Sequence, residues 1–391
     1  MKILILSSYL PFPLYSGGHI RLYNIIKELS KKHSITLVCE DRFYQTEEDR
    51  KELEKFCKKV ITVTKKKQWT VRNILKACFS LYPFLLVGHT NQLFKKTIKE
   101  VVSEEKFDFC HVETFYIMQN LPRLNIPLVL AEHNIEYLVY KRFIETKPFF
   151  LRLFLYLDIL KIKLWEEYYW GKVKKLIAVS EEEKKLMGEK DIEVVPNGVD
   201  VKQYQISKIK NQKSSREKRI LFIGDFRWLQ NRDACEWMIK EIWPHIKSKV
   251  GKLWIVGRKI PDSIKNLTND DDIIFDENAP SETSEIYSNA DILLAPIRVG
   301  GGTSFKILEA MASGLPVVTT PLGIEGIKAV NGKDVLIGEN ADELGHLTVN
   351  VLQDEKLYNK LGIGARKLIE ENYDWKIIVK KLEEVYKDLI R

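Results

Sequence analysis

Short, uninterrupted apolar runs alternate with longer segments of helical periodicity along almost the whole chain, and this alternation limits its fold more than any other feature. The run KILIL at residues 2–6 is ended by SSYLPFP, and the run SITLVCE follows at 34–40. Between them, apolar residues recur at every third position from Ile20 to Leu29, as on one face of an amphipathic helix. Strand, glycine-bearing loop, helix and strand form a βαβ unit, which predicts a parallel sheet with right-handed crossovers.

The same pattern continues through each half of the chain. Further apolar runs in the first half lie at 60–64, 108–113, 127–134, 175–180 and 192–198. Runs in the second half lie at 219–225, 252–258, 272–277, 291–297, 315–320 and 334–339, with a helix predicted from Ala234 to Ile246. We therefore predict an α/β protein with two doubly wound, Rossmann-like domains that face each other across a cleft.

The expected domain boundaries follow from where this pattern stops. Residues 207–218 (SKIKNQKSSREK) hold almost no apolar side chain, which is typical of a linker. We predict an N-terminal domain over 1–206, a linker over 207–218 and a C-terminal domain over 219–372. Residues 373–391 are predicted to form a final helix that crosses back to the N-terminal domain. A length of 391 residues fits two domains of this kind.

Composition excludes several classes of protein. The net charge of +8 is mild for this length, so it permits anionic partners such as nucleotides but does not indicate a nucleic-acid-binding surface. The five cysteines are scattered without a CxxC pair, and the seven histidines show no metal-binding spacing, so we expect neither a disulfide framework nor a metal site. We read no signal peptide and no apolar stretch of spanning length, and we expect a cytoplasmic enzyme.

The most informative stretch runs from Pro296 to Val318, PIRVGGGTSFKILEAMASGLPVV. Three glycines follow a predicted buried strand, and Thr303 and Ser304 then open a helix. Such a helix N-terminus suits a diphosphate, because glycines free the backbone N–H groups to point at an anion. Lys306 and Glu309 share one face of the first turns, where they can neutralise phosphate charge and accept hydrogen bonds from a ribose diol. The alternative is a tight turn beside a surface ion pair.

This segment, together with Asn197-Gly198-Val199-Asp200 and Ile177-Ala178-Val179-Ser180, resembles the retaining glycosyltransferases of family four (glycosyl transferases group 1), which have the GT-B fold. The resemblance covers nearly the whole chain, from the Ser16-Gly17-Gly18 loop to the final helix. It implies transfer of a sugar, with retention, from a UDP- or GDP-sugar to a hydroxyl on a glycan or lipid-linked acceptor. It also implies that no metal or other cofactor is needed, and its commonest setting is bacterial envelope or exopolysaccharide synthesis.

The resemblance also implies roles for particular residues. It assigns His133, Lys306 and Glu309 to catalysis, with Glu309 as the second glutamate of the family's Glu-x7-Glu motif. The residues assigned to the donor and its phosphates are Gly17, Gly18, Gly224, Arg227, Arg258, Gly301, Gly302, Thr303 and Ser304. For Gly17 and Gly18 the alternative is close helix–strand packing, and for Arg227 and Arg258 it is an exposed surface position.

Two departures from the family pattern concern the donor site. The first glutamate of the motif falls at Gly301, so the usual carboxylate beside the sugar is missing. The arginine expected after Gly224 is replaced by Asp225, and Gln230 stands near the expected lysine. Arg227, Arg232 and Lys306 are the cations available in their place.

Residues 141–175 alternate aromatic and aliphatic side chains with Lys and Arg. We interpret them as two packed helices of the first domain. The alternative is a basic, aromatic face that rests on an anionic membrane beside a lipid-linked acceptor. Two other functions stay open for the whole chain, a nucleotide-sugar epimerase and a non-catalytic nucleotide-sugar-binding or scaffold protein.

Overall fold

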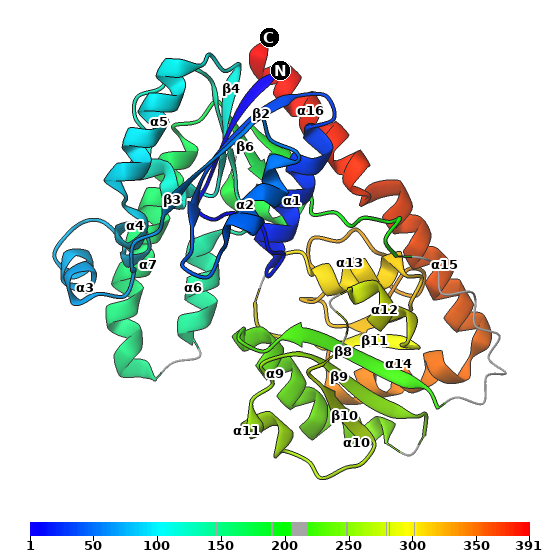
Figure 1. The fold of residues 1–391 in the computed structure, drawn as a ribbon. Coiled ribbons are helices and arrows are strands. Elements are labelled where there is room, and N and C mark those ends of the chain that lie inside the picture. Colours follow the sequence, from blue (N-terminus) through cyan, green and yellow to red (C-terminus); the bar gives the residue numbers. More distant parts are fainter. Residues whose placement is uncertain are drawn as a thin grey trace. The chain divides into compact units, whose positions relative to one another are not determined.

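The structure is a computed structural model that describes residues 1–145, 148–188, 191–204, 217–247, 249–278, 280, 282–300 and 302–391. For residues 150, 151, 153 and 154 only the backbone is described. The chain forms two compact units: Met1–Pro196 with Ile378–Arg391, and Asn197–Ile377. Figure 1 shows their elements along the chain. Most of the predicted linker, 207–216, lies outside the described residues.

The first unit is built on a seven-stranded parallel sheet of order β3-β2-β1-β4-β5-β6-β7. Its strands are β1 (Lys2–Ser7), β2 (Ser34–Asp41), β3 (Lys59–Thr64), β4 (Phe109–Glu113), β5 (Leu128–Ala131), β6 (Lys175–Ala178) and β7 (Ile192–Val194). Each lies within or beside a predicted run. The central strand β1 is buried from Ile3 onward because both faces of the sheet are covered, as its continuous apolar sequence predicts.

Helices cover both faces of this sheet (Figure 1). They are α1 (Gly17–Leu29), α2 (Glu47–Glu54), α3 (Val71–Cys78), α4 (Phe84–His89), α5 (Gln92–Glu104), α6 (Glu136–Glu145), α7 (Phe149–Trp170) and α8 (Glu181–Met187), with the 3₁₀ helix η1 (Phe115–Asn120). The interpretation of 141–175 as packed helices holds, since α6 and α7 lie against each other. No helix in the described part of the chain is long and apolar enough to cross a membrane.

The second unit repeats the plan with a six-stranded parallel sheet of order β10-β9-β8-β11-β12-β13. Its strands are β8 (Arg219–Asp225), β9 (Lys252–Arg258), β10 (Ile273–Asp276), β11 (Ile292–Ala295), β12 (Val317–Thr319) and β13 (Leu336–Ile337). The prediction of two doubly wound α/β sheets is therefore confirmed.

The helices of the second unit include one difference from the sequence prediction. They are α9 (Leu229–Trp237), η2 (Met238–Ile242), α10 (Trp243–Ile246), α11 (Asp262–Lys265), α12 (Thr283–Ser288), α13 (Phe305–Ala312), α14 (Ala341–Gln353) and α15 (Glu355–Asn372). The helix predicted from Ala234 begins at Leu229 and widens into the π-helical turn η2. Pro244 follows within α10, and since it has no N–H it cannot donate a helical hydrogen bond.

The last helix, α16 (Trp375–Ile390), adds its C-terminal part to the first unit. Leu382, Tyr386 and Leu389 are fully buried there, and the Tyr386 ring lies 4.5 Å from that of Phe109 on β4. Glu383 accepts hydrogen bonds from His33 and Lys32 at 2.9 and 3.0 Å.

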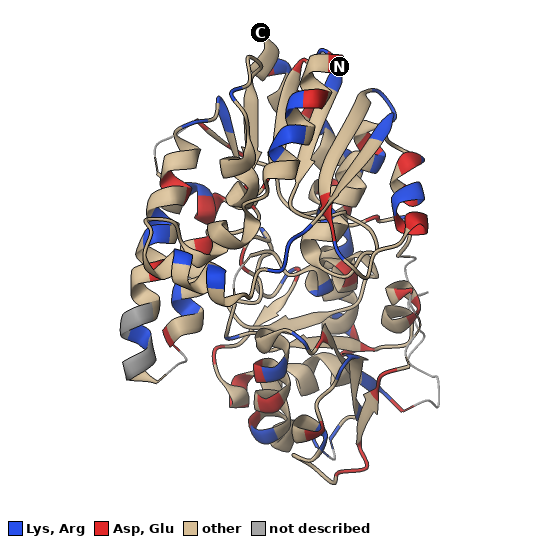
Figure 2. Ribbon diagram, turned by 60° about the vertical axis from the view of Figure 1, so that its left-hand side comes forward, with Lys and Arg blue, Asp and Glu red and all other residues tan. Residues whose placement is uncertain are grey.

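Figure 2 shows that charged positions of the chain lie mainly on helices and at strand ends.

Candidate functional site

The strand order of the second unit places its candidate residues. β8 and β11 are neighbours, and the chain leaves them toward opposite edges of the sheet, to β9 and to β12. Ligands of doubly wound sheets bind outside the carboxyl ends of strands at such a switch point. The loops that follow β8 and β11 carry the residues predicted to bind the donor.

The loop from β11 to α13 ends in a helix N-terminus without a side-chain cap. Gly300 and Gly302 have φ of +124° and +77°, a left-handed conformation that glycine adopts without strain. Ser304 is the N-cap residue, yet its side chain makes no capping hydrogen bond. The buried Thr303 hydroxyl has no hydrogen-bond partner among the described residues. This end of α13 can therefore donate hydrogen bonds to an anion. Gly301 lies outside the described residues.

Lys306 is held in the first turn of α13. Its Nζ donates to Oδ1 of Asn231 at 2.7 Å and lies 4.7 Å from the centre of the Phe222 ring. Burial lowers the pKa of Lys306 to about 8, although its electrostatic interactions with Cys235 and Glu309 raise that pKa. An anion bound here would stabilise the charged ammonium, because opposite charge favours the ionised form.

Asn231 is a residue that the sequence analysis missed. Its Nδ2 donates to the carbonyl oxygen of Asp225 at 2.8 Å, so its amide links the end of β8 to Lys306. A Cβ atom on Gly224 would lie 2.7 Å from the Asn231 side chain, so Gly224 makes room for this link. Asn231 follows Gln230, which stands near the position where the family expects a lysine. This is the one feature of the sequence that could have identified Asn231.

Glu309 lies one turn along α13 from Lys306 and faces two buried tyrosines. Tyr287 donates to its Oε2 at 2.9 Å. Burial raises the pKa of Glu309 to about 7, although hydrogen bonds from Tyr287 and Tyr204 and the charge of Lys306 lower it. The carboxyl group is thus near half-ionised at neutral pH and can accept hydrogen bonds from a diol once ionised. The two tyrosines were also missed by sequence reasoning.

The two arginines predicted for this site lie beside Asp225. Arg227 is exposed, and its Nε lies 3.0 Å from both carboxylate oxygens of Asp225. Arg258 is paired with Asp225 across β8 and β9, and its charge helps lower the pKa of that carboxyl group against the effect of burial. The residue that replaces the family's arginine is therefore neutralised by its neighbours.

The first unit gathers its own candidates at the equivalent place, where β1 and β4 are neighbours. Gly17 and Gly18 begin α1 after the β1 loop, and His133 follows β5. A Cβ atom on Gly18 would lie 2.9 Å from the Tyr9 hydroxyl and 3.2 Å from Nδ1 of His133. The structure thus brings Gly18 and His133 together. It also leaves the buried Tyr9 hydroxyl without a hydrogen-bond partner among the described residues.

His133 is anchored by a buried carboxylate. Its Nε2 makes a short hydrogen bond to Oε2 of Glu113, whose other oxygen lies 3.3 Å from Nε2 of His111. Burial would raise the pKa of Glu113, but the charge of His133 and hydrogen bonds from both histidines hold it well below its usual range. Since an ionised carboxylate only accepts, both Nε2 atoms donate, and Nδ1 of His133 faces Gly18.

The network extends to the last helix. Nδ1 of His111 lies 2.8 Å from the Tyr386 hydroxyl, within hydrogen-bonding distance. Tyr386, His111 and Glu113 are all buried. The orientation of the His133 ring therefore depends on a chain of contacts that begins on α16.

The other strand-end carboxylate, Glu132, has a different environment. It accepts from the Trp170 indole at 3.2 Å and from the backbone N–H of Phe115 at 3.4 Å. Burial raises its pKa well above the usual value, and the nearby charge of Glu166 raises it further. Glu132 is thus a buried hydrogen-bonding group of the first unit whose ionised form is disfavoured by its surroundings.

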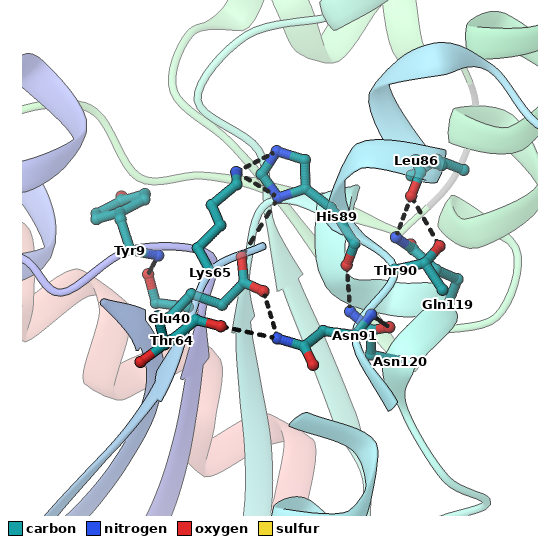
Figure 3. Close-up of polar contacts among 11 residues, drawn as sticks. Tyr9, Glu40, Thr64, Lys65, Leu86, His89, Thr90, Asn91, Gln119 and Asn120 are labelled. Atoms are coloured by element: carbon teal, nitrogen blue, oxygen red, sulfur yellow. Dashed lines mark hydrogen bonds and ion pairs between the residues drawn. The ribbon is translucent and has the colours of Figure 1, made fainter. Parts of the chain in front are cut away.

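A second polar network lies at the ends of β2 and β3 (Figure 3). Asn91 donates to Glu40 at 3.2 Å, and Lys65 Nζ lies 2.9 Å from Nε2 of His89. Burial lowers the pKa of Lys65 to about 8, and the charge of Arg42 lowers it further. Arg42 Nε is itself buried without a hydrogen-bond partner among the described residues. These side chains form a partly buried, basic edge of the first unit that the sequence analysis did not identify.

No three His, Cys, Asp or Glu side chains gather as a metal-binding group among the residues that the structure describes.

Two family models match the chain. The model described as Glycosyltransferase Family 4 matches residues 15–203, and the model described as Glycosyl transferases group 1 matches residues 217–354. Together they span most of both units, including the first-unit residues Gly17, Gly18 and His133 and the second-unit residues Lys306 and Glu309.

Two curated proteins are similar in sequence to the chain. An uncharacterized 44.6 kDa protein in the cps region of Klebsiella pneumoniae is 22% identical, over 96% of this chain and 97% of its own. An N-acetyl-alpha-D-glucosaminyl L-malate synthase of Bacillus anthracis is 27% identical over 52% of this chain and 55% of its own.

Solved structures share the fold over the whole length. Sucrose-phosphate synthase from Thermosynechococcus elongatus matches with a TM-score of 0.73 at 16% identity, covering 100% of this chain and 99% of that one. Anabaena HepE in complex with UDP-glucose matches with a TM-score of 0.67 at 15% identity, covering 99% and 100%. At these identities the likeness concerns the fold.

Proposed function

Because the chain belongs to the glycosyltransferases of family four, with the GT-B fold, we propose that it transfers a sugar from a nucleotide diphosphate sugar and retains the anomeric configuration. The observation that carries the proposal is the pairing of Lys306 and Glu309 at the uncapped N-terminus of α13. The helix end and Lys306 would hold the diphosphate, and Glu309 would hold the ribose diol. The solved complex of HepE with UDP-glucose supports a nucleotide sugar as donor.

The proposed catalysis is electrostatic. Lys306 and the N–H groups at the start of α13 stabilise the diphosphate as the bond from the anomeric carbon to its oxygen breaks. The acceptor oxygen bonds to the same face of that carbon, and its proton passes to an oxygen of the departing diphosphate. This route uses no enzyme nucleophile and no metal ion, and it is compatible with a glycine at 301.

His133 is proposed to position the sugar. With Nε2 bound to Glu113, its Nδ1 can accept a hydrogen bond from a sugar hydroxyl beside Gly17 and Gly18. A Cβ atom at Gly18 would overlap Tyr9 and His133, so this glycine lets α1 approach the His133 ring closely.

The acceptor is proposed to be a glycan or a lipid-linked sugar, in the synthesis of a bacterial envelope or exopolysaccharide. The relative from a cps region supports a role in polysaccharide synthesis. The basic edge formed by Arg42 and Lys65 would suit an acceptor that carries a phosphate or carboxylate. We also propose that the enzyme works at the inner face of a membrane, in peripheral contact with anionic lipids.

One assay separates this proposal from its rivals. The protein is incubated with UDP- and GDP-sugars and a bacterial lipid extract, and the products are followed by NMR. We expect release of the nucleoside diphosphate only when acceptor is present, and a product whose anomeric coupling matches that of the donor. Isomerisation of the donor without nucleotide release would instead identify an epimerase. Binding without turnover of any donor would identify a non-catalytic protein.

A further inference from the structure

The helix α3 does not bury its apolar side chains within its own unit. Ala77 is its one buried residue, whereas Val71 and Leu75 are 73% and 52% exposed. The flanking residues are exposed as well: Trp69 is 79%, Phe79 86% and Leu81 82% exposed. Amphipathic helices of soluble domains turn such side chains to the core, as α5 does with Phe94, Ile98 and Val101. Exposed aromatic and aliphatic side chains gathered in one segment mark an interaction surface.

The neighbouring helix α7 continues this surface. Leu157, Leu160, Leu164 and Tyr168 recur along one face of the helix and are between 50% and 67% exposed. Lys161 and Trp165 lie at the edge of that face and hold the 77–82 segment. Lys161 donates to the carbonyl of Ala77 at 2.7 Å, and the Trp165 indole donates to that of Leu81 at 2.9 Å.

These contacts place the 77–81 segment beside α7. Figure 1 shows α3 on the same side of the first unit as α7. Tyr82 also stacks on Trp165 with ring centres 4.5 Å apart. We call the exposed apolar side chains of 69–81 and of the α7 row the α3–α7 surface.

The charge around the α3 part of this surface indicates what covers it. The sequence from 55 to 99 contains no Asp or Glu, and Lys66, Lys67, Arg72 and Lys76 are all exposed in or next to α3. A protein partner that covered only the apolar side chains would leave these cations unused. An anionic bilayer contacts both the apolar side chains and the cations. The apolar side chains enter the boundary of the acyl chains, and the cations contact the headgroups. Trp69 and Tyr168 are also residue types that favour that boundary.

We infer that the α3–α7 surface is the site at which this protein docks on an anionic lipid membrane. The inference deepens the peripheral contact proposed above and moves its centre from residues 141–175 to α3, which sequence reasoning did not single out. In this arrangement Trp69, Phe79 and Leu81 enter the headgroup boundary, and Lys66, Lys67 and Lys76 attract anionic lipid. The α7 row enlarges the apolar contact.

The test uses the full chain and vesicles of phosphatidylcholine, with or without phosphatidylglycerol. We expect co-sedimentation with the anionic vesicles, weaker binding at high salt, and a blue shift of tryptophan fluorescence that is lost in Trp69→Phe. The double variant Phe79→Ser with Leu81→Ser should lose at least tenfold in vesicle affinity, as should Lys66→Glu with Lys67→Glu. Because these side chains are exposed, the variants should keep their melting temperature.

Matched controls lie elsewhere on the same unit. Phe43→Ser changes a side chain that is 97% exposed outside this surface, and Lys380→Glu with Lys381→Glu reverses two exposed charges on α16. Both should bind vesicles as the wild type does. The inference is overturned if the wild type ignores anionic vesicles, or if the α3 variants bind as well as these controls. It is also overturned if the Phe79 and Leu81 changes dissolve an oligomer instead. Nucleotide binding by the same samples shows whether the donor site is intact. Failure of the membrane-docking proposal can therefore be distinguished from failure of the proposed glycosyltransferase function.

Discussion

Glu113 and His133 form a short hydrogen bond between the ends of adjacent parallel strands, and the carboxylate is completely buried. The same carboxylate accepts from His111, which connects it to Tyr386 on the final helix. The ring of His133 is thus held in one direction, with Nδ1 toward Gly18. A histidine fixed in this way can recognise a hydroxyl through Nδ1.

Replacing Glu113 tests this arrangement. Glu113→Gln keeps the shape but presents an N–H group to one of two donating histidines, so we expect a loss of about 1–3 kcal/mol in the free energy of unfolding. Transfer should slow by roughly tenfold or more, because His133 loses its fixed direction. Chemical denaturation and donor turnover measure the two effects. Glu132→Gln is the matched control: burial raises the pKa of this strand-end carboxyl group, and its hydrogen bonds come from Trp170 and Phe115. A loss of turnover as large as that of Glu113→Gln would contradict the proposed role of Glu113.

Adding one methyl group at Gly18 should displace the side chains of Tyr9 and His133. In Gly18→Ala the new Cβ meets the Tyr9 hydroxyl and His133, and relief of that overlap should cost about 1–3 kcal/mol. We expect reduced transfer, measured by turnover, while nucleotide affinity at the second unit changes less. Gly171→Ala is the control, since its nearest neighbour would lie 3.5 Å away. If Gly18→Ala is as active as the wild type, the glycine pair serves helix–strand packing and has no direct role in transfer.

The affinity for a nucleoside diphosphate should depend on pH in a bell-shaped manner. Burial raises the pKa of Glu309 to about 7, so it accepts hydrogen bonds from a ribose as an ion only above that pH. Burial lowers the pKa of Lys306 to about 8, so it carries its charge only below that pH. Calorimetric titrations across this range should give a maximum between about 7 and 8. A flat profile from pH 6 to 9 would show that neither group contacts the ligand.

Glu309 should also make the free energy of unfolding of the ligand-free protein depend on pH. Its pKa is raised on folding, so its contribution to the free energy of unfolding is complete at acid pH and is lost as pH rises through about 7. Glu309→Gln removes this loss, so the variant should gain stability relative to wild type above pH 7. Urea denaturation at two pH values checks the sign, and a constant difference between the proteins would contradict it.

Asn231 should matter for nucleotide binding although it is not itself charged. Asn231→Ala removes the acceptor of Lys306 and its link to the end of β8, so the ammonium group is no longer fixed. We expect nucleotide affinity to fall by about 1 kcal/mol or more, roughly five- to tenfold. Asn231→Asp keeps an acceptor for Lys306 and should retain more affinity than the alanine variant. The reverse order would show that Asn231 acts only through packing.

The sheets could be predicted because their strands are buried on both faces, which makes each one a continuous apolar run such as KILIL. The positions of Lys306 and Glu309 followed from helical periodicity after a glycine-rich loop. The Glu113–His133 contact could not, because it depends on β4 and β5 being neighbours in the sheet, and apolar runs do not give strand order.

Contacts between distant parts of the chain were missed for a related reason. Asn231 is 75 residues from Lys306, and Tyr386 is 275 residues from His111. The exposed apolar face of α3 was missed because its sequence has the periodicity of a buried helix. Only the packing shows that the described residues of the unit leave this face exposed.

The N-terminus of α13, with Lys306 and Glu309, is proposed to bind a nucleoside diphosphate. The most direct measurement is calorimetric titration of UDP and GDP into wild type, Lys306→Ala, Glu309→Ala and Lys240→Ala, the last changing an exposed lysine of the same unit. We predict that one nucleotide binds wild type and Lys240→Ala equally and binds the other two at least about tenfold more weakly, a loss of about 1.4 kcal/mol. No binding of either nucleotide by folded wild type, or equal binding by all four proteins, would contradict the account.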